Sequence, residues 1–211
     1  MDANKYLDDI TEIKNIMNRS SRFISLSGLS GVMAGVYSLI GAGLAYVRLK
    51  AISGSSYEGL SGRTDTLWET KIITDLTLIA LGVVVAAAVT GFILTLKKSK
   101  KSGERLWDVS SRRLVANFLI PLVAGGLFCL VLIQYNVAGL VAPTTLIFYG
   151  LACVNASKYT MGDVRYMGLA FITLGTLSTQ FIGYGLYFWA LGFGVFHIIY
   201  GGMMYFKYDR N

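Results

Sequence analysis

The chain has 211 residues, of which 54% are hydrophobic and only 15% are charged, with a formal net charge of +7 and a mean hydropathy of +0.56. Because a soluble domain carries about 25% charged residues, this chain has too little polar surface to coat a water-soluble globule. With 24 Gly, 2 Pro and 2 Cys, the composition also excludes a disordered chain, a collagen and a disulfide scaffold, and it leaves an integral membrane protein.

Residues 1–22 precede the first long apolar run, and we expect them to form an amphipathic helix on the cytoplasmic side of the membrane. Four apolar residues recur at helical spacing and share one face of this helix: Tyr6, Ile10, Ile13 and Met17. This face could dock a partner protein or a second copy of the chain. Alternatively, it lies against the cytoplasmic end of the chain's own bundle, because apolar helix faces are usually buried.

Six apolar runs follow, each of about the 20 residues that a helix needs to cross a hydrocarbon core roughly 30 Å thick. In chain order they cover residues 23–47, 72–96, 114–134, 137–156, 166–182 and 184–206, and residues 207–211 form a cytoplasmic tail. The runs do not alternate between apolar and polar residues, so they predict helices rather than the strands of a barrel. The sequence therefore predicts an all-α integral membrane protein, with six transmembrane helices in three hairpins as one membrane domain.

Small residues recur at regular spacing on three of the expected spans, where they would allow close contact between helices. The spacing is four residues on the first span and seven on the fifth and sixth: Ser27, Gly31, Gly35, Gly168, Gly175, Gly185, Gly192, Gly194 and Gly201. These stripes could bind another subunit, but packing within one chain is the simpler interpretation.

The basic residues predict the orientation, because Lys and Arg concentrate in cytoplasmic loops. With six spans, fifteen of the 19 basic residues fall on the side of the two termini and four on the other, which predicts a cytoplasmic N-terminus and C-terminus. Trp68 and Trp107 lie near span ends, as interfacial anchors do. The basic run from Lys97 to Lys101 adjoins a span and contains no aromatic residue, so we assign it to anionic headgroups rather than to nucleic acid. We expect a prokaryotic inner (plasma) membrane.

Ionisable residues inside a membrane are functional candidates by default, and the expected spans contain two of them. Asp75 lies near the external end of the second span, within one turn of Lys71, where we expect an interfacial acid. His197, the only histidine in the chain, lies well inside the sixth span.

His197 could share a polar pocket that opens to the cytoplasm. From a rise of about 1.5 Å per residue, three further polar residues lie at a similar depth or closer to that surface: Ser30, Asn117 and Asn155. The alternative is that His197 makes a single interhelical hydrogen bond that holds two helices in register. The sequence leaves both interpretations open.

No motif in the sequence predicts a catalytic, cofactor-binding or metal site. Cys129 and Cys153 are expected at depths that differ by roughly 15 Å, too far apart for a disulfide, so we expect free thiols. Gly28 to Gly31 has the pattern GxSG, in which Ser30 could pair with His197 as nucleophile and base. Such a motif outside its structural context is weak evidence for an enzyme.

Three classes of function remain, in order of preference. The first is an accessory or scaffold subunit that acts through protein–protein contacts, and the second is a small transporter or channel for a neutral or lipid-like solute, with a polar cavity around His197. The third is an intramembrane enzyme. The scarcity of charge in the spans favours the first class, because a proton-coupled pump needs carboxylates on its path. The expected partners are the lipid bilayer and either another membrane protein or a second copy, with no nucleic acid and no cofactor.

Overall fold

The computed structural model describes residues 27–55, 66–102 and 107–209. Within these ranges every regular element is helical: α2 (Gly28–Ser55), α3 (Thr66–Ser102), α4 (Val109–Gln134), η1 (Ala138–Leu140), α5 (Val141–Ala156), η2 (Ser157–Tyr159), α6 (Asp163–Ser178), α7 (Gly185–Trp189), η3 (Ala190–Phe196), α8 (His197–Met204) and η4 (Tyr205–Asp209). The last four follow one another without a break and form one C-terminal helix, residues 185–209, in which η3 and η4 are π-helical. The predicted amphipathic helix of residues 1–22 lies outside the described residues, and so does its apolar face.

Five stretches of the described chain are long and apolar enough to cross a membrane: Gly28–Ala51, Lys71–Lys101, Val109–Gln134, Ala138–Tyr159 and Gly185–Lys207. The remaining predicted span, 166–182, coincides with α6, which has 16 residues. At 1.5 Å per residue α6 is about 24 Å long, less than the roughly 30 Å of a hydrocarbon core. The protein is therefore a helical protein with five candidate membrane spans, which implies contact with a lipid bilayer, and the sixth span stays a prediction.

The short length of α6 has a local cause. After Ser178 the chain turns, and Gly183 adopts a positive φ of 99° before the C-terminal helix begins. Glycine suits this conformation because it has no Cβ to clash with the backbone. The turn between α4 and α5 uses Asn136 at φ 60°, a residue that also tolerates the left-handed region.

Two helices are longer than the sequence predicts. α2 has 28 residues and continues to Ser55, whereas its predicted span ends at residue 47. α3 has 37 residues, a length of about 56 Å, and includes the whole lysine run that follows its predicted span. Apolar runs mark the part of a helix that lies in lipid, but a helix continues into water where good helix formers such as Lys follow.

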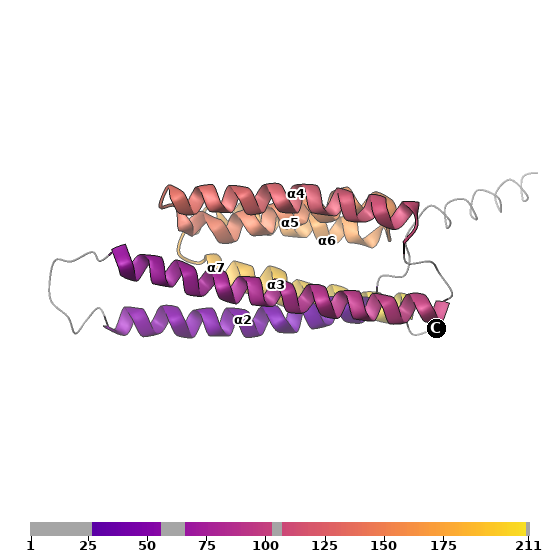
Figure 1. Ribbon diagram of the computed structural model, residues 1–211, viewed down its shortest axis with the longest axis horizontal. Coiled ribbons are helices and arrows are strands. Elements are labelled where there is room, and N and C mark those ends of the chain that lie inside the picture. The colour runs from indigo at the N-terminus through magenta and orange to yellow at the C-terminus, as the bar shows by residue number, and fades with distance from the viewer. Residues whose placement is uncertain (1–26, 56–65, 103–106, 210–211) are drawn as a thin grey trace, which may run out of the picture.

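The helices run side by side along the long axis of the molecule, in two groups (Figure 1). The first group is α4, α5 and α6, in which α5 packs against both neighbours. The second group is α2, α3 and the C-terminal helix, in which α2 packs against both of the others. The C-terminal helix also contacts α5 and α6 through α7, so it joins the two groups.

The pairing of helices follows the predicted hairpins in part. α2 packs against α3, and α4 packs against α5, as expected for consecutive spans. The third predicted pair differs, because α6 packs mainly on α5 and the C-terminal helix packs mainly on α2. Glycines explain this choice, since they let α5 approach α6, and α2 approach the C-terminal helix, more closely than larger residues would.

Candidate functional site

His197 is the first residue of α8, directly after the π-helical segment η3, and its side chain is only 6% exposed. Its Nε2 lies 2.7 Å from the hydroxyl of Tyr149 on α5, and its Nδ1 lies 3.4 Å from the carbonyl oxygen of Gly192. A carbonyl oxygen only accepts hydrogen bonds, so Nδ1 donates to Gly192, while Nε2 and the Tyr149 hydroxyl share the second hydrogen bond. Both ring nitrogens are engaged, and the ring links the C-terminal helix to α5.

Aromatic rings enclose this hydrogen bond. The ring centroids of Tyr149 and Phe171 each lie 5.2 Å from that of His197, and Phe193 stacks on His197 at 5.9 Å. Phe118 on α4 completes the group with an edge contact to Tyr149 at 5.8 Å. We call these five residues the aromatic cluster. It takes side chains from α4, α5, α6 and the C-terminal helix, so it is where the two groups of helices meet.

The other predicted pocket residues form separate hydrogen bonds. Asn155 on α5 donates its side-chain amide to the carbonyl oxygen of Asn117 on α4 at 2.9 Å, and the Asn117 amide donates to the carbonyl oxygen of Arg113 at 2.8 Å. Ser30 donates its hydroxyl to the carbonyl oxygen of Ser27, the residue directly before α2, at 2.5 Å. The structure thus brings Asn117 and Asn155 together and places Ser30 and His197 in two further, independent hydrogen-bonded groups.

These bonds bear on the possible Ser30–His197 pair. A nucleophile and its base need to share a hydrogen bond. The Ser30 hydroxyl donates to Ser27, and the Nε2 of His197 is hydrogen-bonded to the Tyr149 hydroxyl. The two side chains are therefore not arranged as a nucleophile and base.

The remaining candidates are placed more simply. Asp75 is half-buried on α3, one turn after Lys71, and its role as an interfacial acid stays a prediction. Cys129 on α4 and Cys153 on α5 are buried free cysteines, as expected. Among the described residues, no group of three His, Cys, Asp or Glu side chains could hold a metal ion.

The small residues of α2 lie against the C-terminal helix. A Cβ placed on Gly35 would lie 2.7 Å from the carbonyl oxygen of Gly194, and one placed on Gly31 would lie 3.1 Å from the Cα of Gly201. A Cβ on Gly201 would lie 2.7 Å from the carbonyl oxygen of Gly28. These two helices therefore touch backbone to backbone, at separations that a side chain larger than glycine would prevent.

The small residues of the fifth and sixth predicted spans also lie at contacts. A Cβ on Gly168 would lie 2.7 Å from the carbonyl oxygen of Gly150, and one on Gly175 would lie 2.9 Å from the backbone nitrogen of Ile147, so both glycines of α6 face α5. Gly192 faces the side chain of Leu146 on α5, and Gly185 faces Ala142.

Sequence reasoning missed the partner of His197 and several of the contact glycines, among them Gly28 and Gly150. Tyr149 could have been found, because a tyrosine in the middle of an apolar span needs a hydrogen-bond partner for its hydroxyl. Gly28 and Gly150 carry no such signal, because the chain contains 24 glycines and several of them meet nothing.

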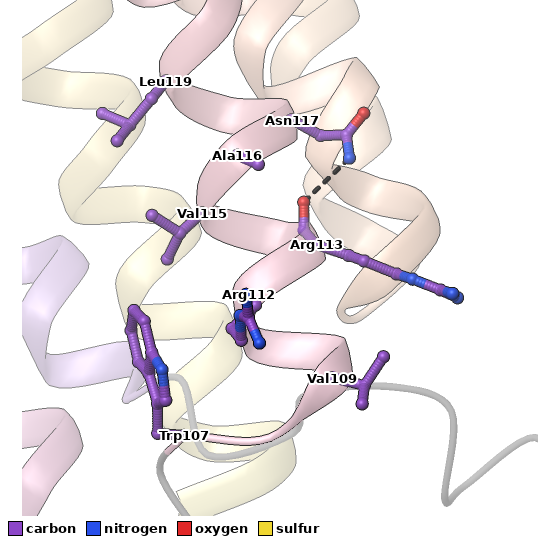
Figure 2. A pocket seen from close by; sticks show the side chains of 8 residues that line it. All are labelled: Trp107, Val109, Arg112, Arg113, Val115, Ala116, Asn117 and Leu119. Atoms are coloured by element: carbon purple, nitrogen blue, oxygen red, sulfur yellow. Dashed lines mark hydrogen bonds between the residues drawn. The ribbon is translucent and has the colours of Figure 1, made fainter.

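A groove of about 600 Å³ follows the first turns of α4 (Figure 2). Trp107 and Arg112 lie at the end where α4 begins, and Val115, Ala116 and Leu119 line the groove further along the helix. Arg113 also lines the groove but points away from Trp107, and the Asn117 amide is bonded to its carbonyl oxygen.

The start of α4 is fixed by a capping box. The Asp108 carboxylate accepts from the backbone N–H of Ser111 at 2.7 Å, and the Ser111 hydroxyl oxygen accepts from the backbone N–H of Asp108 at 2.9 Å. Reciprocal caps of this kind satisfy two backbone donors at a helix start. Arg112 and Arg113 are the next two residues, so the same cap holds the backbone that carries them.

The fold and these contacts define a helical protein with several candidate membrane spans, whose helix groups meet at a buried Tyr–His pair. No protein-family model matches the chain, and neither does any curated protein or solved structure.

Proposed function

We propose that this protein is an accessory or scaffold subunit, and that it binds another membrane protein through α3. The observation that carries the proposal is the position of α3, which packs mainly on α2 and contributes no buried residue from its apolar window, whereas a third of the α5 window is buried. A helix held by one neighbour presents most of its surface to the membrane. That surface is available to a transmembrane helix of a partner.

The outward side of α3 has features that suit a helix–helix contact. Leu78, Val85, Val89 and Phe92 are all more than half exposed and follow a spacing of three and four residues. Gly82 falls on the same line, and a Cβ placed there would meet nothing within 4 Å. In lipid, helices associate through close packing around small residues, so a notch beside large side chains supports such a contact.

The charge at the end of α3 favours a different protein over a second copy. The helix ends in a lysine run in which Lys97, Lys100 and Lys101 are exposed. A parallel, symmetric contact between two α3 helices would place two such runs against each other, and like charges at close range repel. We therefore propose a partner with acidic residues next to its own transmembrane helix.

The polar residues give less support to a transporter. A solute path needs polar groups that line a common cavity, but His197 is enclosed by aromatic rings and the Asn117–Asn155 bond is separate from it. Each of these groups already has a hydrogen-bond partner. They are better explained as contacts that hold helices in register.

A photo-crosslinking experiment in native membranes tests the α3 proposal. A photoreactive amino acid replaces Val85 or Phe92 on α3, and matched probes replace Val123 or Leu127, which are equally exposed on α4. We expect a discrete adduct with a second protein from the α3 probes and not from the α4 probes. An adduct of twice the chain mass would indicate a second copy, and only lipid adducts from α3 would refute the docking surface.

We also propose that α6 crosses the membrane as a sixth helix. The membrane is a prokaryotic inner membrane, and both termini of the chain lie in the cytoplasm. α6 lies alongside α5, and its first residue, Asp163, forms a 2.7 Å ion pair with Lys207 near the end of the C-terminal helix. The end of α3 and the end of the C-terminal helix also lie at one end of the bundle (Figure 1). This placement supports the prediction that the basic loops lie together on the cytoplasmic side of the membrane.

Cysteine labelling in intact cells tests this topology, because both native cysteines are buried. We expect a membrane-impermeant maleimide to label a Tyr184→Cys variant from outside and a Lys158→Cys variant only after lysis. If α6 does not cross, both positions lie on the same side and both variants label under the same condition.

A further inference from the structure

The groove along the first turns of α4 combines a charged end with an apolar wall. Arg112 and Trp107 lie at the end where the helix begins, and Trp107 is 70% exposed. Val115 and Leu119 follow Arg112 by three and seven residues, so they continue along the same side of the helix, with Ala116 between them (Figure 2). From Arg112 to Leu119 the groove extends for about 10 Å along the helix axis.

We propose that this groove binds an anionic phospholipid. The headgroup phosphate contacts the guanidinium of Arg112, and one acyl chain lies along Val115, Ala116 and Leu119. Arg113, which lines the groove further round the helix, adds a second positive charge. Guanidinium groups bind phosphate oxygens through paired, charge-assisted hydrogen bonds. Trp107 lies at the same level, where tryptophan marks the boundary between headgroups and hydrocarbon.

The state of the two arginines supports a ligand of negative charge. Both side chains are exposed, and within the described ranges neither guanidinium takes part in an ion pair. The Asn117 amide already donates to a backbone carbonyl, so the charge in the groove comes from the arginines. A lipid with net negative charge satisfies them better than a zwitterionic lipid, whose own cation opposes the same site.

The apolar wall distinguishes a lipid from a free phosphate ion. A free phosphate would use the arginines and leave Val115, Ala116 and Leu119 without a role. A phospholipid uses both parts, because its charged group and its chain are joined at the spacing that the groove offers. Basic pockets beside transmembrane helices on the cytoplasmic side are suited to this kind of lipid headgroup. The site lies on α4 and does not depend on the proposed role of α3.

Native mass spectrometry of the full-length protein in mild detergent tests the proposal, with dioleoyl phosphatidylglycerol and dioleoyl phosphatidylcholine as probes. We expect bound phosphatidylglycerol at lower lipid concentration than phosphatidylcholine. The double variant Arg112→Gln and Arg113→Gln should weaken phosphatidylglycerol binding by about tenfold or more, because charge-assisted hydrogen bonds are lost. The matched control, Lys100→Gln with Lys101→Gln on α3, removes the same charge outside the groove and should leave binding nearly unchanged.

A second variant separates the lipid from a free anion. Ala116→Trp fills the apolar wall and keeps both arginines. It should therefore weaken phosphatidylglycerol binding, whereas binding of inorganic phosphate, which uses only the arginines, should stay unchanged. The proposal is overturned if inorganic phosphate displaces the lipid fully at millimolar concentration, which would indicate an anion site only. It is also overturned if the two lipids bind equally, or if the lysine control loses as much binding as the arginine variant. All of these substitutions lie at exposed positions, and gel filtration of each variant checks that the fold is retained.

Discussion

The centre of the molecule and α3 are held in place by different means. At the centre, the aromatic cluster joins four helices, with Phe171 fully buried and the Tyr149–His197 hydrogen bond inside it. α3 packs mainly on a single neighbour, α2, and a 3.1 Å hydrogen bond joins the hydroxyl groups of Tyr37 and Thr90 across this contact. The first region fixes the arrangement of the bundle, whereas the second leaves a helix surface free for lipid or for a partner.

The comparison shows what apolar residues do in a membrane. α3 is strongly apolar and almost none of it is buried, while the glycine-rich C-terminal helix is packed along most of its length. In water the more apolar helix would be the more buried one. In lipid the apolar side chains are already solvated, so contacts form where small residues let backbones approach and where polar groups find partners.

The largest effect is expected at the backbone contact between α2 and the C-terminal helix. A Gly201→Leu variant places a side chain against the backbone of Gly28 and Val32, and we expect the loss of about 3 kcal/mol or more of unfolding free energy, because overpacking forces the helices apart. Gly202→Leu is the matched control, since a Cβ there meets nothing within 4 Å. Unfolding in mixed micelles measures both, and equal stabilities would show that this contact does not hold the bundle.

The next prediction compares two phenylalanines directly. Phe171→Ala at the fully buried position should cost about 2–4 kcal/mol of unfolding free energy, because it leaves a cavity among packed rings. Phe92→Ala on α3, where the side chain is 62% exposed, should cost less than about 0.5 kcal/mol. If the Phe92 variant were the less stable of the two in the purified protein, α3 would be packed far more tightly than the structure indicates.

A smaller effect is expected for the hydrogen bond inside the aromatic cluster. A double-mutant cycle of Tyr149→Phe and His197→Phe should give a coupling of about 1 kcal/mol in unfolding free energy, as for other hydrogen bonds between membrane helices. A coupling near zero would mean that Tyr149 and His197 act independently. The matched single variant Tyr37→Phe, which removes the α2–α3 bond, should cost no more than this, because its partner Thr90 lies on a helix that packs mainly on one neighbour.

The apolar runs predicted most of the fold, because about twenty apolar residues suffice to identify a membrane helix. They could not predict that α6 ends at Ser178, since a turn at Gly183 rather than hydropathy sets that limit. Nor did they predict that the C-terminal helix pairs with α2 instead of α6. That pairing depends on which glycines face each other. The sequence does not show this, because several of its glycines make no contact with another helix.

The candidate polar pocket shows a different limit. The sequence places Ser30, Asn117, Asn155 and His197 by depth, because the rise of a helix per residue is known. Depth gives no information about the direction in which a side chain points around its helix. In the structure His197 points toward Tyr149 and Ser30 bonds to Ser27 at the start of its own helix, and a single sequence does not supply those directions.

The smallest effect is expected for the ion pair at one end of the bundle, where Lys207 near the end of the C-terminal helix pairs with Asp163 at the start of α6. The lysine side chain is 58% exposed, so Lys207→Gln should cost at most about 0.5 kcal/mol of unfolding free energy. The difference should disappear in high salt, because exposed charges are screened. Lys158→Gln, an exposed lysine near the same end of the bundle, is the matched control. A cost above about 2 kcal/mol that persisted in salt would contradict the expectation for an exposed pair. It would mean that this ion pair, rather than the aromatic cluster, holds the two groups of helices together.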